Sequence, residues 1–191
     1  MSDVENRHRL APGFLIAPPP LSDPNFDRTV VLLAAHEEAG SMGFIINRAS
    51  SMGLHLLLND LEIVPTIDDK IVLLGGPVNG SAGFVLYEHE ADKPLGPGIE
   101  VSPNVSVSPA RDVLEQAATG KLPGRFDLLL GYAGWAPEQL EGELQRGSWL
   151  HAPFDHELLF DVPLDQRWDE TYARLGVNPF GFISVRGGAQ A

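Results

Sequence analysis

A small group of polar residues and glycines has the side chains and the backbone freedom needed to bind a ligand. Asp23 supplies a carboxylate, Arg28 supplies a fixed cation, and glycine lets backbone N–H groups approach an anion closely. The predicted ligand-binding residues are Asp23, Arg28, Gly75, Gly76, Gly131, Tyr132, Gly134 and Trp135. Together they could bind a small anion or polar metabolite beside residues 131–135, where we predict that a buried strand breaks into a turn.

The same residues also have structural explanations, and the sequence leaves both open. Asp23 could cap its own turn, Arg28 could pair with an acid, and the glycines could serve only tight packing. Tryptophans in a chain of this size usually belong to the core. We therefore predict that Trp135 is structural.

Three weaker candidates lie at the ends of two predicted neighbouring strands. His36 ends the first strand, and Asn47 and Arg48 end the second. His36 is either a hydrogen-bonded structural histidine or a base. If the two strands form a hairpin, His36 lies beside the turn and Asn47 at the opposite end, which argues against one shared site.

The sequence lacks the motifs of the common catalytic and cofactor chemistries. It contains no cysteine, no G-x-S-x-G, no S-x-x-K and no H-E-x-x-H. Pro77, directly after Gly75-Gly76, has no backbone N–H to donate to a phosphate, which favours a structural turn there. Residues 23–27 begin like a calcium loop, but Arg28 and Ala34 occupy the positions that need glycine and glutamate. We expect no metal and no cofactor, and the absence of catalysis is favoured over an enzyme.

The charge balance argues against nucleic acids and anionic membranes as partners. Asp and Glu outnumber Lys and Arg by 26 to 13, the net charge is −13, and the basic residues form no stripe. No apolar run reaches about eighteen residues, and the polar N-terminus does not resemble a signal peptide. The lack of cysteine suits a reducing compartment, so we expect a cytoplasmic protein whose partner is a small polar or anionic metabolite or another protein.

The order of apolar segments predicts an α+β fold. Strands are expected at residues 13–17, 29–36, 42–47, 71–74, 83–87 and 127–130, and helices at residues 54–61, 109–120, 137–146 and 164–175. The elements do not alternate as in a doubly wound fold, and no linker divides them. We predict one domain over residues 13–178, with a flexible leader at 1–12 and a tail at 179–191.

Two local expectations follow from turn chemistry. Residues 71–74 and 83–87 are expected to pair through an Asn79-Gly80 turn. Ser108 is expected to cap the helix that follows it, with Pro109 in the first turn.

Several motifs, in this order and spacing, resemble those of the YqgE/AlgH family of bacterial proteins. They are residues 23–31, His36, residues 43–48, 75–77, 83–86, 131–135, 139–141 and 148–150, and the pair Arg167-Trp168. The resemblance covers about residues 13–177 and implies a single cytosolic domain with a branched, mixed β-sheet packed with several helices. Ala49, Ala82 and Tyr87 depart from the family pattern, so a site that needs a basic residue at position 82 or 87 is in doubt.

The resemblance implies less about activity than about fold. Some family members are labelled transcriptional regulators, but the label is associational and the biochemical activity of the family is not established. One hypothesis is a regulatory or binding protein that acts indirectly on transcription without catalysis. The alternative is an enzyme or sensor that binds a small anionic or polar metabolite.

Overall fold

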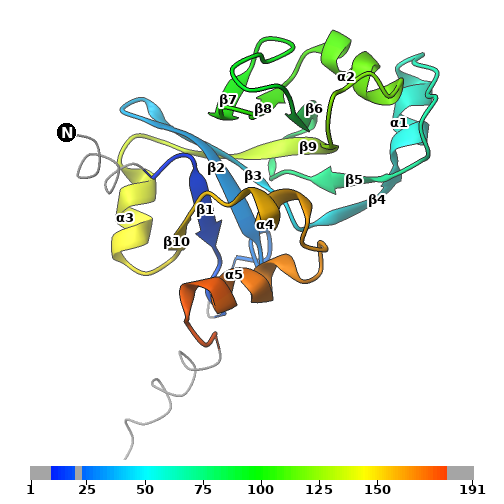
Figure 1. The fold of residues 1–191 in the computed structure, drawn as a ribbon. Helices are drawn as coiled ribbons and strands as arrows, with labels where there is room; N and C mark the ends of the chain where they lie inside the picture. Colours follow the sequence, from blue (N-terminus) through cyan, green and yellow to red (C-terminus); the bar gives the residue numbers. More distant parts are fainter. Residues whose placement is uncertain (1–9, 20–22, 180–191) are drawn as a thin grey trace, which may run out of the picture.

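A branched β-sheet forms the framework of the molecule (Figure 1). The structure is a computed structural model that describes residues 10–19 and 23–179, so most of the predicted leader and tail lies outside the described residues. The strands in the described part are β1 (Gly13–Ile16), β2 (Val30–Glu37), β3 (Gly40–Ile45), β4 (Ala49–Gly53), β5 (Ile71–Leu74), β6 (Val78–Glu88), β7 (Ile99–Ser102), β8 (Val105–Ser108), β9 (Phe126–Trp135) and β10 (Leu150–Pro153). The helices there are α1 (Leu54–Asp60), α2 (Arg111–Ala118), α3 (Gln139–Gln145), α4 (His156–Phe160) and α5 (Arg167–Leu175).

The strand order explains both the branching and the mixed character of the sheet. The main path runs β10-β1-β2-β3-β9-β6-β8-β7, and β5 joins it from the side by pairing with both β4 and β9. Only the β5–β9 pair is parallel among the strand pairs of residues 10–19 and 23–179. The sheet curls until β7 lies against β2. The expected α+β fold with a branched, mixed sheet is confirmed.

Strand β9 is the branch point. Its first half pairs with β5 at Leu129 and Leu130, and its second half pairs with β3 from Ala133 to Trp135. Gly131 sits between the halves with φ +72°. Leu129 and Tyr132, on either side of Gly131, face the same core, so the alternation of faces shifts by one residue there, as at a β-bulge.

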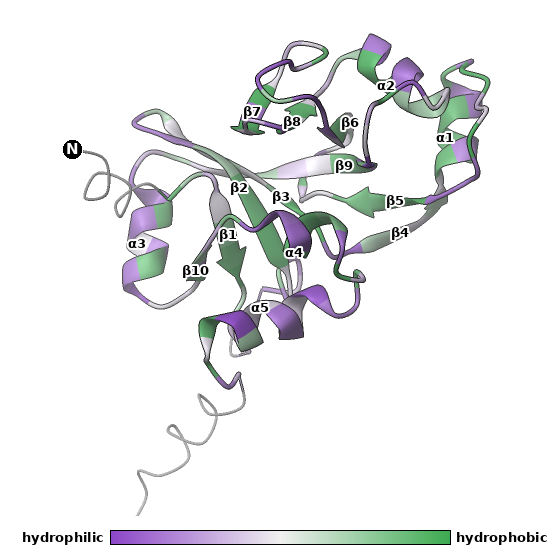
Figure 2. Ribbon diagram, in the orientation of Figure 1, coloured by the Kyte–Doolittle hydropathy of each residue, from purple (hydrophilic) through white to green (hydrophobic). Residues whose placement is uncertain are grey.

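Strands β1, β2 and β5 are strongly hydrophobic, as their green colour in Figure 2 shows. Alternation along the strands other than β9 divides the apolar residues among three cores. Phe14 and Ile16 of β1 face the central core with α4 and α5, whereas Leu15 faces the core covered by α3. Helices α1 and α2 cover a further core at the β5–β6–β9 end. Trp168 is 3% exposed and donates its indole N–H to the Ala17 carbonyl, which confirms it as a core residue.

Three local expectations were wrong. The strand beginning near residue 127 does not break at Gly131, because the bulge absorbs that glycine and β9 continues to Trp135. Strands β5 and β6 do not form a hairpin: Asn79 and Gly80 lie inside β6, whose register with β9 shifts there. Ser108 is not the cap of α2, since the chain stays extended through Ala110.

Candidate functional site

The predicted site residues Asp23 and Arg28 lie in the loop that leads into β2, and hydrogen bonds fix the position of this loop. Asp23 Oδ1 accepts a hydrogen bond from the Asn25 backbone N–H at 2.9 Å, so Asp23 stabilises its own turn. Asn47 Nδ2 donates to the Arg28 carbonyl at 2.9 Å, and Arg48 NH1 donates to the Asn25 carbonyl at 2.5 Å. Asn47 and Arg48 therefore hold the loop in place.

The Arg28 side chain is directed to the core helix α5. Its guanidinium lies 5.1 Å from the ring centroid of Trp168, within the range of a cation–π contact. Its backbone has φ +50°, an uncommon conformation for a residue other than glycine. Arg28 is itself exposed, and its guanidinium packs on the ring of the buried Trp168.

The two glycine segments meet where β5 ends beside β9. The Gly75 N–H donates to the Leu130 carbonyl at 2.7 Å. A Cβ atom on Gly75 would lie 2.4 Å from the Gly131 carbonyl oxygen, and one on Gly76 would lie 2.2 Å from the Tyr132 carbonyl carbon. The glycines permit this close crossing of two backbones, and the Gly75 donor is already used inside it.

The aromatic residues after Gly131 also have internal partners. The Tyr132 ring meets Phe84 edge-on, with 6.1 Å between centroids. Trp135 is 7% exposed and donates its indole N–H to Glu143 at 2.9 Å. Gly134 is exposed beside the Tyr132 ring. Each contact supports a structural role for these side chains.

His36 lies away from Asn47 and Arg48, as the hairpin predicted. Its Nδ1 is 2.7 Å from the Ser41 hydroxyl and its Nε2 is 3.6 Å from Glu141. His36 and Ser41 face each other near the turn between β2 and β3, whereas Asn47 lies beyond the far end of β3. These weaker candidates therefore belong to two separate places.

The structure brings Gly75, Gly76, Gly131 and Tyr132 together. Separately, Asn47 bonds Arg28, and Arg48 bonds Asn25, the residue whose N–H donates to Asp23. Within residues 10–19 and 23–179, none of these residues lines the groove between α1 and α2 or the cavity beside the α4–α5 loop. A single site shared by both groups stays a prediction.

Tyr87 is one of the positions that depart from the family pattern. It is fully buried and its hydroxyl accepts a hydrogen bond from the Leu95 N–H, so position 87 supplies no basic group to a ligand site.

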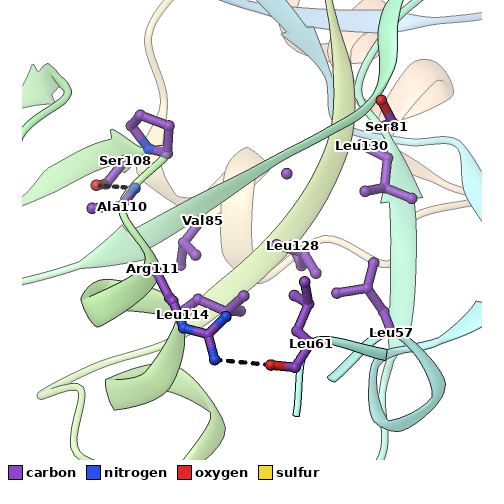
Figure 3. A pocket seen from close by; sticks show the side chains of 12 residues that line it. Leu57, Leu61, Ser81, Val85, Ser108, Ala110, Arg111, Leu114, Leu128 and Leu130 are labelled. Carbon is purple, nitrogen blue, oxygen red and sulfur yellow. Dashed lines mark hydrogen bonds between the residues drawn. The ribbon is translucent and has the colours of Figure 1, made fainter. Parts of the chain in front are cut away.

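A different feature, an open apolar groove, lies between α1 and α2 (Figure 3). It has a volume of about 270 Å³, and its aliphatic walls come from both helices and from β6 and β9. The wall residues are Leu57, Leu61, Val85, Leu114, Leu128 and Leu130. Figure 3 shows Leu57, Leu61 and Leu128 directed toward the same space.

Polar groups occur at the margins of this groove. Arg111 crosses from α2 to α1, where its NH2 donates to the Leu61 carbonyl at 2.8 Å and its Nε donates to Glu115 at 2.8 Å. Ser108 donates to the Pro97 carbonyl at 2.6 Å and accepts from the Ala110 N–H. The Ser108 hydroxyl is thus used internally, and the arrangement can hold an apolar molecule while presenting the Arg111 guanidinium to a polar end. Within the described ranges, no cluster of three His, Asp or Glu side chains is placed to hold a metal ion.

Sequence reasoning missed this groove because helical leucine spacing looks the same for a packed face and for an open one. Gly83, a glycine within β6, was the available signal, because such a glycine often marks a site where a ligand or another backbone approaches closely.

None of the helices in the described part of the chain has the length and apolar character needed to cross a bilayer.

Comparisons with known proteins agree on one family. The model of the AlgH-like family matches residues 14–180. A UPF0301 protein from Anaeromyxobacter sp. (strain K) is 38% identical over 95% of this chain and 96% of its own length, and one from Rhizobium rhizogenes is 39% identical over 93% and 94%.

Two solved structures have a similar fold. The solution structure of the AlgH protein from Pseudomonas aeruginosa is 38% identical, covers 100% of this chain and 97% of its own, and superposes with a TM-score of 0.76. The crystal structure of protein DIP2367 from Corynebacterium diphtheriae, 22% identical over 86% of each chain with a TM-score of 0.68, is similar in fold alone.

Proposed function

We propose that this chain, which belongs to the AlgH-like family, is a cytoplasmic regulatory binding protein that holds a small amphipathic molecule in the α1–α2 groove and acts without catalysis of its own. The open aliphatic groove is the observation that carries the proposal. Ligand sites are typically concave and mainly apolar, with a few polar groups that fix orientation.

The size and lining of the groove define the ligand. Its volume of about 270 Å³ lies just below the range of roughly 300–1,000 Å³ that holds drug-sized ligands, so the ligand is small. Five of its twelve lining residues are leucines, which favours a ligand with a short aliphatic portion. Arg111 at the margin has N–H donors beyond those given to Leu61 and Glu115, which favours a hydroxyl or carboxylate at one end of the ligand.

Filling the groove from β6 is expected to weaken ligand binding. Gly83 lines the groove, and a Cβ atom placed on it would be 3.8 Å from Leu128 Cδ1, an ordinary contact that leaves the strand unstrained. Butyrate, hexanoate, octanoate and the matching alcohols are tested for a rise in the melting temperature of the parent protein, because a ligand that binds the folded state stabilises it. The Gly83→Val variant is expected to bind the best of these at least about tenfold more weakly, a loss of ~1.4 kcal/mol.

The matched control is Gly80→Val, which makes the same change three residues earlier on β6. A Cβ atom at Gly80 has no described neighbour within 4 Å, and Gly80 does not line the groove. This variant is expected to bind as the parent does. The proposal is contradicted if no compound of the series shifts the parent, or if a folded Gly83→Val variant responds as strongly as the parent.

Any effect on transcription is expected to be indirect. The net charge is −13, and α2 and α3 are separated by β9 and do not form a helix-turn-helix pair. In a mobility-shift assay at physiological salt, the protein should give no sequence-specific retardation of promoter DNA. Sequence-specific retardation at nanomolar protein concentration would overturn this expectation.

A further inference from the structure

Arg167, the first residue of α5, is a buried cation. Arg167 is only 4% exposed, and its side chain donates hydrogen bonds to two backbone carbonyls. Nε donates to the Val162 carbonyl at 3.0 Å, and NH1 donates to the Ile46 carbonyl. These two bonds fix the plane of the guanidinium between the α4–α5 loop and the end of the β3 region. A guanidinium has five N–H donors, so donors on its far side remain.

No carboxylate among residues 10–19 and 23–179 lies within 4.0 Å of this guanidinium. By contrast, Arg111, Arg125 and Arg174 each form ion pairs although they are far more exposed. Burial lowers the pKa of Arg167, and the more distant charge of Asp127 opposes that shift only in part. A buried charge without a counter-ion is costly, so its retention needs an explanation.

Arg167 lines a cavity of about 290 Å³ whose walls come from the α4–α5 loop and from residues at the starts of β5 and β9. Lys70 and Arg125 also line it. Lys70 Nζ lies 4.4 Å from the centroid of the Phe126 ring, and the Arg125 guanidinium lies 5.2 Å from that of Phe160. Both rings belong to the cavity wall, and these contacts hold the two cations in defined positions.

The acids of this cavity are already engaged. Asp127 lies 3.0 Å from Lys70 Nζ, and Asp161 lies 2.5 Å from Arg125 NH1. Glu88, which does not line the cavity, also accepts hydrogen bonds from the Arg125 guanidinium at 3.0 and 3.1 Å, so three acids face the three cations of this cluster. Among the described residues, Arg167 is the cation of the three whose guanidinium or ammonium group has no carboxylate within 4.0 Å, so its donors are the ones left for a ligand.

We propose that this cavity binds the oxyanion group of a small molecule, a carboxylate or a phosphate, through the free donors of Arg167. The planar fork of a guanidinium matches both oxyanions, and in a water-poor setting such a hydrogen bond is strong. The cavity shares no lining residue with the α1–α2 groove, so this site is independent of the proposed function above.

The test follows the Arg167 side chain directly in the unmodified, isotope-labelled full chain by NMR. Sodium acetate and inorganic phosphate are titrated separately at constant ionic strength, with sodium chloride as the reference. Saturable shifts of the Arg167 Nε–H signal and of the Val162 and Leu164 amides, with no shift at Leu114 in the groove, are expected. Saturation by acetate identifies a carboxylate ligand, and saturation by phosphate alone identifies a phosphate ligand.

A matched pair of variants tests the geometry. Arg167→Lys keeps the charge but loses the fork, and it is expected to weaken binding by about tenfold, the factor that ~1.4 kcal/mol produces. Arg174→Lys makes the same change on the same helix at an arginine already paired with acids, and it should leave the affinity unchanged. The proposal is overturned if neither anion shifts the Arg167 signal beyond chloride, or if a folded Arg167→Lys variant binds as tightly as the parent.

Discussion

Trp135→Ala is expected to lower the free energy of unfolding by about 3–5 kcal/mol, the cost of removing a large buried side chain and leaving a cavity. Trp135 is 7% exposed in the core beneath α3 and meets Trp149 edge-on, with 6.1 Å between centroids. Both indoles donate to Glu143 Oε2, at 2.9 and 2.8 Å. The substitution therefore removes packing and one of the hydrogen bonds that satisfy this carboxylate.

Urea denaturation checks the prediction through the midpoint and slope of the transition. Leu56→Ala is the control, because Leu56 is 58% exposed on α1 and its loss should change stability by no more than about 0.5 kcal/mol. Trp135→Phe, which keeps a ring but lacks the N–H, should fall between the two. A parent-like midpoint for Trp135→Ala would show that the residue is not part of the core.

Gly131→Ala is expected to cost about 2–5 kcal/mol, because strain from a left-handed backbone adds to overpacking. The backbone has φ +72°, and a Cβ atom would lie 2.5 Å from the Gly76 carbonyl oxygen and 2.9 Å from that of Val78. Both contacts are with backbone atoms, which cannot rotate away. The methyl group would push β5 and β6 from β9 at the branch of the sheet.

Gly147→Ala separates the two causes. Gly147 has the same φ of +72°, but a Cβ atom there has no described neighbour within 4 Å, so only the conformational cost of about 1–2 kcal/mol applies. The difference between the two variants in thermal or chemical denaturation measures the close crossing alone. Equal costs at the two positions would contradict the tight crossing at Gly131.

Local periodicity located most elements but not the pairing of the central strands. The apolar runs of β2 and β5 and the helical stripe of α5 were readable because each is a local pattern. The role of Gly131 was not readable, since a glycine in a bulge and a glycine that ends a strand have the same sequence signal. The Asn79-Gly80 pair misled for a similar reason, as it occurs inside an irregular part of β6.

The candidate site was predictable only in part. The meeting of Gly75 with Gly131 was expected, but the position of Arg28 depended on contacts with Asn47 and Trp168, which are distant in sequence, and Asp23 is used within its own turn. Arg167 was noted only as part of the Arg167-Trp168 motif and not as a site residue, because its burial and its lack of an acidic partner exist only in the folded chain.

The branch at β9 also constrains how the chain can fold while it is being synthesised. Strands β1–β3, the β4–β5 pair and strands β6–β8 all leave the ribosome before β9, and each group can pair within itself. Among the strand pairs of residues 10–19 and 23–179, none joins the three groups until residues 126–135 emerge. The nascent chain therefore holds open strand edges for most of its translation, and these edges are where aggregation or chaperone capture would begin.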